Sequence, residues 1–118
     1  MVLKCKANVN AVDKDGKTPL HYAADDDAVE AIECLVLKCK ANVKAVDKDG
    51  KTPLHIAAGN DAAKVIECFV LKCKANVNAV DKDGKTPLRY ALDNDAAEAI
   101  ECLGRYTRGQ QDRYDLFA

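Results

Sequence analysis

The side chains with the greatest capacity for chemistry in this 118-residue chain are six cysteines and two histidines. Thiols and imidazoles serve nucleophilic catalysis, metal binding or disulfide formation, so their spacing has to decide among these roles. Neither His21 nor His55 has a serine, cysteine or carboxylate at a spacing diagnostic of a catalytic pair. No Cys-x-x-Cys or His-x3–5-His pair is present, whereas zinc ligands come in such close pairs. We therefore expect no catalytic residue, no metal and no cofactor.

Aspartates also recur, in pairs two residues apart, but they lack the loop spacing of a calcium site. Asp and Gly together favour tight turns, because Asp bonds its own backbone and Gly supplies a positive φ. We expect these residues to form turns: Asp13, Asp15, Asp47, Asp49, Asp81 and Asp83.

The cysteines form two series with a constant spacing of 34 residues, namely Cys5, Cys39, Cys73 and Cys34, Cys68, Cys102. Packed helices lie about 8–10 Å apart, beyond the Cα separation of about 7 Å that a disulfide tolerates. Residues five apart on an α-helix, such as Cys34 and Cys39, point to different faces. We predict that all six thiols are free and that the second series fills the core as small hydrophobic side chains.

The same period governs the whole chain, because residues 13–24 recur at 47–58 and at 81–92. In the first copy Thr18 is a helix N-cap and Pro19 suits the first helical position. Apolar residues at i, i+3 and i+4 follow, which predicts a short helix near residues 18–25 with one buried face. Each copy therefore predicts a turn followed by a capped helix.

A second helix is predicted in each copy, from about Ala28 to Cys39 in the first. Val29, Ile32, Leu35 and Val36 form its apolar stripe. Asp27 and Glu30 have the spacing of a capping box at its start. Asp95 and Glu98 repeat this box in the third copy.

The run Asp-x-x-Gly-x-Thr-Pro-Leu-His-x-Ala-Ala resembles the signature of the ankyrin repeat family, and Ala-Asn-Val-Asn-Ala at 7–11 and 75–79 resembles its hairpin segment. The resemblance covers residues 1 to about 103. It implies an all-α, ankyrin-type α-solenoid of stacked helix-turn-helix repeats with projecting β-hairpin loops. It also implies protein binding without enzyme activity, and a structural role for the histidines.

Two features depart from the family pattern. The period is 34 rather than the usual 33, with the extra residue in Val36–Lys40 and its copies. The glycine that normally ends the second helix is absent, so the left-handed conformation is predicted for Lys6, Lys40 and Lys74.

We predict five segments along the chain. Residues 1–12 are the end of a truncated repeat and a hairpin. Residues 13–46, 47–80 and 81–103 are three repeats, and residues 104–118 are a C-terminal cap or tail. The second helix of the third repeat is expected to stop near Gly104. Tyr106, Tyr114, Leu116 and Phe117 are candidates to cover the exposed core of the last repeat, with a docking motif as the alternative. The chain begins in mid-repeat, which suggests a fragment of a longer array and self-association through an uncapped N-terminal end.

Composition and charge limit the classes of partner that this chain is expected to bind. The net charge of −1, with acidic and basic residues interleaved, argues against a nucleic-acid surface. No apolar run approaches the length of a membrane span, and the N-terminus lacks the apolar core of a signal peptide. We expect an intracellular, cytoplasmic protein that binds neither nucleic acid nor membrane.

The resemblance places protein binding on a concave face made of hairpin tips and first helices. The alternative is a structural scaffold, or a segment of a consensus-like array without a dedicated ligand, which the uniform hairpin tips favour. Variation at Tyr22, Ile56 and Tyr90 favours binding. The candidate binding residues are Val12, Lys14, Asp15, Lys17, Tyr22, Asp25, Asp26, Val46, Lys48, Asp49, Lys51, Ile56, Asn60, Val80, Lys82, Asp83, Lys85, Tyr90 and Asn94.

Overall fold

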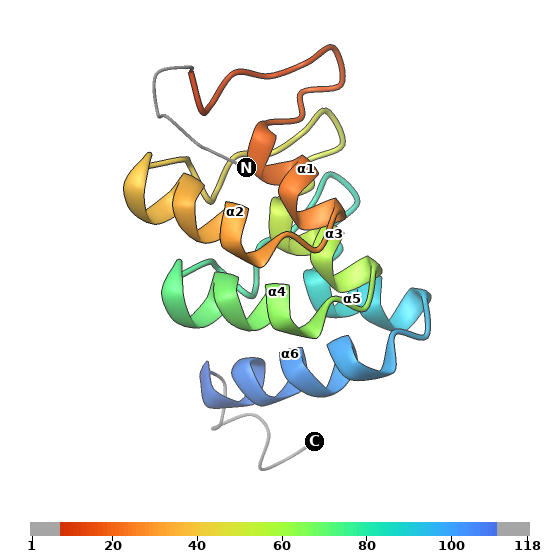
Figure 1. Cartoon of the computed structure of the whole chain (residues 1–118). Helices are drawn as coiled ribbons and strands as arrows, with labels where there is room; N and C mark the ends of the chain where they lie inside the picture. Colours follow the sequence, from red (N-terminus) through yellow and green to blue (C-terminus); the bar gives the residue numbers. More distant parts are fainter. Residues whose placement is uncertain (1–7, 111–118) are drawn as a thin grey trace.

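Helices stack in two rows, one helix pair per repeat (Figure 1). The structure, a computed structural model, describes residues 8–110, with side chains up to residue 107. The inner row consists of α1 (Pro19–Asp25), α3 (Pro53–Gly59) and α5 (Pro87–Asp93). The outer row consists of α2 (Val29–Glu33) with the π-helical turn η1 (Cys34–Lys38), α4 (Ala63–Glu67) with η2 (Cys68–Lys72), and α6 (Ala97–Gln110). This arrangement confirms the predicted all-α solenoid.

The inner helices begin where the sequence predicts. Thr52 caps α3, since its side chain accepts a hydrogen bond from the backbone N–H of His55, and Pro53 occupies the first turn. The same cap occurs at Thr18 and Thr86. These caps satisfy amides that a helix start otherwise leaves without partners, so each seven-residue helix is stabilised locally.

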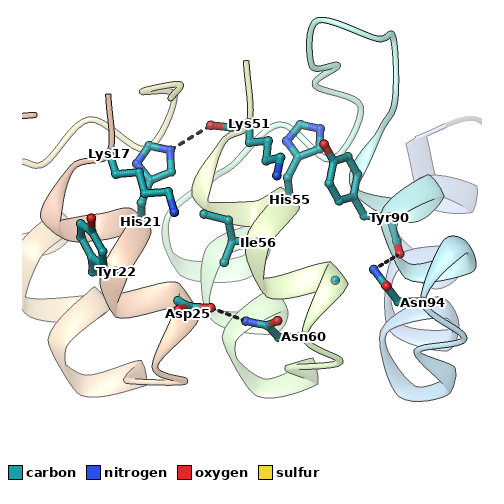
Figure 2. Close-up of a pocket in the computed structure, with 11 residues that line it drawn as sticks. Lys17, His21, Tyr22, Asp25, Lys51, His55, Ile56, Asn60, Tyr90 and Asn94 are labelled. Atoms are coloured by element: carbon teal, nitrogen blue, oxygen red, sulfur yellow. Dashed lines mark hydrogen bonds between the residues drawn. The ribbon is translucent and has the colours of Figure 1, made fainter. Parts of the chain in front are cut away.

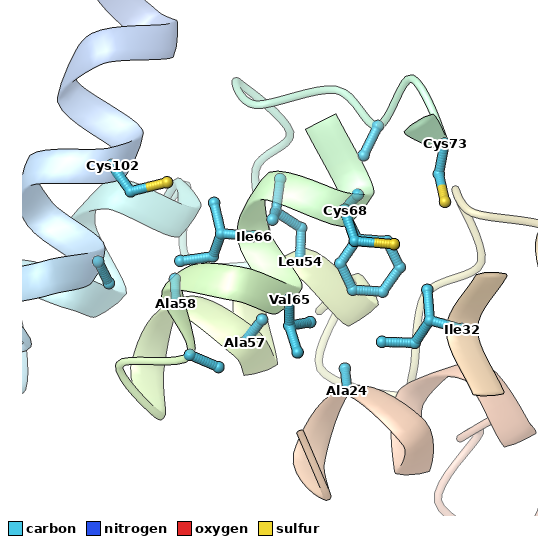
Figure 3. Packing of buried hydrophobic residues seen from close by; sticks show 14 of the residues in the cluster. Ala24, Ile32, Leu54, Ala57, Ala58, Val65, Ile66, Cys68, Cys73 and Cys102 are labelled. Atoms are coloured by element: carbon cyan, nitrogen blue, oxygen red, sulfur yellow. The ribbon is translucent and has the colours of Figure 1, made fainter. Parts of the chain in front are cut away.

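Alanines let the two rows pack closely. Ala57 and Ala58 of α3 are fully buried, as are Val65 and Ile66 of α4 and Phe69 of η2. These side chains form part of one continuous hydrophobic core (Figure 3). The small inner residues face larger outer ones, which lets the two rows approach closely.

The projecting loops are turns, and no strand occurs between residues 8 and 110. The amide of Asp47 donates to the carbonyl of Lys51, and the amide of Gly50 to the carbonyl of Asp47. Adjacent loop tips are joined by backbone hydrogen bonds, such as that from Lys82 N to Asp49 O at 3.1 Å. Gly50 has φ +82°, and a Cβ there would lie 2.8 Å from Lys82 N, so glycine is required on both counts.

The predicted capping boxes of the outer helices are wrong. The N-cap of α2 is Ala28, with no side-chain cap, because Asp27 adopts a left-handed conformation (φ 57°) one residue earlier. Asp95 is likewise left-handed, at φ 53°. Asp61, in the same conformation, instead accepts a hydrogen bond from the amide of Ala99 in α6 at 2.8 Å. This aspartate therefore caps the outer helix of the next repeat rather than its own.

The extra residue of the 34-residue period is accommodated as a π-turn. In η1 the amide of Cys39 donates to the carbonyl of Cys34, five residues earlier, and η2 repeats the bond from Cys73 to Cys68, both at 3.1 Å. A π-turn is the usual result of one residue inserted in a helix. Leu37 and Leu71 are more than half exposed on this turn, so the insertion bulges outward.

The left-handed conformation predicted at the end of each outer helix is confirmed for Lys40 (φ 61°) and Lys74 (φ 58°). The amide of Ala41 then donates to the carbonyl of Leu35 at 2.8 Å, a bond that spans one residue more than the 6→1 bond of a Schellman motif, because the preceding turn is π-helical. Lys6, assigned the same role, lies outside the described residues.

Two further expectations need correction. Helix α6 does not stop at Gly104 but continues to Gln110, because a glycine inside a packed helix costs only about 1 kcal/mol, less than packing contributes. Tyr106 on this extension packs against the core. Tyr114, Leu116 and Phe117 lie outside the described residues.

The prediction of six free thiols is also wrong. Cys34, Cys68, Cys73 and Cys102 are free, but Cys39 is disulfide-bonded. The prediction used the spacing between helix axes, whereas Cys39 sits beyond η1 as its C-cap, where that spacing does not apply. Cys5 lies outside the described residues. Cys68 and Cys102 fill the core as predicted, while Cys34 is half-buried.

Because Lys40 has a positive φ, Lys40→Gly should stabilise the fold by about 0.5–1 kcal/mol, since glycine relieves the clash of Cβ with the backbone. Midpoints of urea denaturation measure this. Lys38→Gly, inside η1, is the control and should destabilise by about 1 kcal/mol. Equal losses at both positions would contradict the assignment.

Candidate functional site

A groove of about 350 Å³ crosses the exposed side of the inner helices (Figure 2). We call it the inner groove, and its lining residues are Lys17, His21, Tyr22, Asp25, Lys51, His55, Ile56, Gly59, Asn60, Tyr90 and Asn94. Eight of these were predicted as binding residues from the sequence, all but the two histidines and Gly59. The groove therefore brings together side chains from all three repeats.

Two histidines form the deepest part of the groove, and both are fully buried. The backbone N–H of Thr52 donates to His55 Nδ1 at 3.0 Å, so Nδ1 must be the unprotonated nitrogen. Nε2 therefore carries the proton and donates to the carbonyl of Lys85 in the next repeat at 2.9 Å. His21 makes the equivalent bond to the carbonyl of Lys51 at 2.8 Å (Figure 2). Their structural role between repeats is thereby confirmed.

Tyrosines lie at the two ends of the row of inner helices. The hydroxyl of Tyr22 donates to Asp13, and that of Tyr90 donates to Asp81. The hydrogen bond from Tyr22 lowers the pKa of the Asp13 carboxyl, and that from Tyr90 lowers the pKa of Asp81. Tyr90 also meets the edge of the His55 ring, with ring centroids 5.0 Å apart. The orientation of each tyrosine is thus fixed by a hydrogen bond to the loop that precedes its own helix.

Ile56 takes the place of tyrosine in the middle repeat. Asp47 there accepts backbone hydrogen bonds from Asp49 and Lys51 at 2.9 Å, as its equivalents do, but faces no tyrosine hydroxyl. The half-buried Ile56 is also shorter than the tyrosines beside it. The centre of the groove is consequently apolar and recessed between two aromatic walls.

Two lysines lie above these walls. The ammonium of Lys17 is 5.8 Å from the ring centroid of Tyr22, and that of Lys51 is 5.6 Å from the ring centroid of Tyr90. Within residues 8–107, neither lysine forms an ion pair, whereas the equivalent Lys85 pairs with Asp93 at 3.3 Å. These two ammonium groups are therefore available to a carboxylate from outside.

Polar groups close the other end of the groove. Asn60 donates to Asp25 at 2.9 Å, and Asn94 donates to the carbonyl of Tyr90 at 2.9 Å (Figure 2). Gly59 separates these pairs, and a Cβ there would lie 3.3 Å from the Asn94 amide. The absence of a side chain at this position keeps the groove open.

The other predicted binding residues lie elsewhere. At the loop tips, Lys48 pairs with Asp15 at 3.1 Å, and Lys82 and Asp49 join adjacent loops through their backbones. Val46 and Val80 line a separate hollow of about 200 Å³ on the loop side, and Val12, the equivalent residue of the first repeat, is exposed. Asp83 and Lys85 line the end of the stack beside Leu92. Lys14 and Asp26 are exposed. The structure thus separates the nineteen candidates into several surfaces.

Among the described residues, no three His, Cys, Asp or Glu side chains gather as metal ligands. In the same part of the chain, no helix is long and apolar enough to cross a membrane.

The model of the family described as ankyrin repeats (3 copies) matches residues 1–80 and 26–113, nearly the whole chain. No curated protein matches the chain.

Burial lowers the pKa of His55 below its ordinary value of 6.5. The folded state therefore binds fewer protons than the unfolded state as the pH falls below this value, and stability should decrease there. Protonated Nδ1 also cannot accept the Thr52 amide. Urea midpoints between about pH 8 and pH 5 should fall for the wild-type protein, and less for His55→Asn. A larger fall for the variant would contradict the assigned role.

Ile56→Tyr should restore the missing contact with Asp47. A hydroxyl that donates to this carboxylate should stabilise the fold by about 1 kcal/mol, measured by denaturant midpoints. Ile56→Phe provides the ring without the hydroxyl and should show no such gain. Equal stability of the two variants would mean that no hydrogen bond forms.

Proposed function

Because this chain belongs to the ankyrin repeat family, whose members are generally protein-interaction modules, we propose that it binds a partner protein in the inner groove. The observation that carries the proposal is the recess at Ile56, which lies between two aromatic walls and below two ammonium groups without ion pairs. Ankyrin repeats are typically non-enzymatic, and shape and charge complementarity would be the whole mechanism.

The contacts of the groove favour a particular kind of partner segment. An apolar side chain fits above Ile56, where it would be buried against Tyr22 and Tyr90. A neighbouring carboxylate would reach Lys17 or Lys51, whose charge is already partly stabilised by the tyrosine faces beneath. Aromatic side chains surrounded by charge are the residues that most often dominate binding free energy.

The loop tips are less suited to carry specificity. Backbone hydrogen bonds link the tips at both described repeat boundaries, and at one of them the side chains of Lys48 and Asp15 also pair. Their residues are also the same in every repeat. Ile56 differs from its equivalents Tyr22 and Tyr90, and all three lie in the groove, so the proposal assigns selectivity to the inner helices.

The test compares two double variants with equal changes of charge. Tyr22→Ala with Lys51→Glu removes one wall and reverses one ammonium charge, and should abolish capture of the partner from a cell extract. Truncation of such an aromatic residue typically costs about 2–4 kcal/mol of binding free energy. Circular dichroism and the denaturation midpoint should show that the fold survives.

Leu71→Ala with Lys64→Glu is the matched control. Leu71 is exposed on η2, and Lys64 is exposed on α4, so capture should persist. Loss of capture with this outer pair, together with retention by the inner pair, would overturn the proposal. Absence of any reproducible partner with the wild-type protein would favour the scaffold alternative.

A further inference from the structure

The π-turn η2 brings two buried thiols together on the outer row, away from the inner groove. The amide of Cys73 donates to the carbonyl of Cys68 at 3.1 Å, which places residue i+5 over residue i. On an ordinary α-helix these two side chains would point to different faces. Figure 3 shows both sulfur atoms on the side of η2 that faces Ile32. The insertion that lengthens the repeat therefore creates a dithiol.

Both cysteines are buried, with 5% and 8% of their surfaces exposed, and both are free. They are close enough for each thiol to act on the pKa of the other through a side-chain interaction. Burial raises the pKa of Cys68, and burial together with the neighbouring Cys68 raises that of Cys73 to about 12. The pair is therefore protonated near neutral pH.

The preceding repeat carries a disulfide at the equivalent position, although not across its own π-turn, because Cys34 is free. Cys39 has φ −102° and ψ −1° as the C-cap of η1, and Cys73 has φ −101° and ψ −4° as the C-cap of η2. Cys39 is disulfide-bonded and Cys73 is free. The backbone conformation at this position is thus compatible with an oxidised sulfur.

We propose that Cys68 and Cys73 form a modification site that reacts with a small-molecule disulfide and closes to an intramolecular disulfide across the π-turn. Its closure would fix the junction between the outer helix of the second repeat and the loop that leads to the third. The site is separate from the proposed binding function and does not depend on it.

The reaction proceeds in two balanced steps of thiol–disulfide exchange. The Cys68 thiolate attacks one sulfur of the small disulfide, which breaks the S–S bond, releases one small thiolate and leaves a mixed disulfide on Cys68. The Cys73 thiol then loses its proton to solvent, and its thiolate attacks Cys68 Sγ and expels the second small thiolate. The cysteines are oxidised, and the small disulfide is reduced to two thiols.

Conversion of the Cys68 thiol to a mixed disulfide favours the second step. Cys68 raises the pKa of Cys73 both through its charge and through the side-chain interaction. Both effects end once Cys68 carries the mixed disulfide, so the Cys73 thiolate becomes more accessible at that stage. Cys102 has no comparable neighbour, because Thr107 stands five residues later. It therefore serves as an internal control.

The test incubates the full chain with oxidised glutathione at about pH 8.5, where a larger share of thiols is ionised. Remaining thiols are then blocked with N-ethylmaleimide and the protein is digested with trypsin. Lys72 lies between the two cysteines, so cleavage separates residues 65–72 from the dipeptide Cys73-Lys74. We expect most of fragment 65–72 to be recovered linked to this dipeptide, lighter by two hydrogen atoms than the two fragments together.

Cys73→Ser provides the second arm. Its Cys68 should retain glutathione, because the resolving thiol is gone, and Cys102 should carry glutathione or maleimide in both proteins. Glutathione retained on Cys68 or Cys73 of the wild-type protein, without the linked fragment, would overturn the proposal. Maleimide on both Cys68 and Cys73 while Cys34 has reacted with glutathione would overturn it equally.

Discussion

The hydrogen bond from a buried histidine to the carbonyl of the following repeat is the interaction on which the rest of the structure depends. His21 reaches the carbonyl of Lys51, and His55 reaches that of Lys85. The threonine cap fixes the imidazole tautomer, because a backbone amide occupies Nδ1. A buried donor without an acceptor costs about 1–3 kcal/mol, so the next repeat must lie where its carbonyl completes the bond. The same bond holds the backbone of Lys51, whose ammonium lies over Tyr90 in the inner groove.

Local features of the fold were predictable from the sequence. Thr52 and Pro53 specify the start of α3 whatever surrounds it, since the cap involves only residues of its own first turn. The left-handed Lys40 was predictable because the helix has to end there without a glycine. Eight residues of the inner groove followed from the family resemblance. The two histidines at the bottom of the groove were not predicted as binding residues. Sequence reasoning gave them a structural role, and a residue with such a role can also line the surface that a ligand would meet.

Features that depend on contacts between repeats were missed. Asp61 is the equivalent of Asp27 and Asp95, which were predicted as local caps, yet its left-handed backbone turns the carboxylate toward the amide of Ala99 in the next repeat. A period of 34 residues reveals an insertion but not its form, and the π-turn changes which side chains share a face. For the same reason Cys68 and Cys73 were placed on different faces. The disulfide at Cys39 escaped prediction because distances between helix axes do not describe the loop beyond the helix.

The third repeat differs from the others at the surface that each repeat offers to its successor. Ala24 and Ala58 are buried there, whereas the equivalent Leu92 is half exposed. Arg89 replaces the bridging histidine and instead bonds Asp93 at 3.1 Å within its own helix. The array can consequently be lengthened more readily by insertion before the third repeat than by addition after it. A duplicate of residues 47–80 inserted before the third repeat would find every bridging bond in place. A unit appended against α5 would meet a bulky side chain and no imidazole.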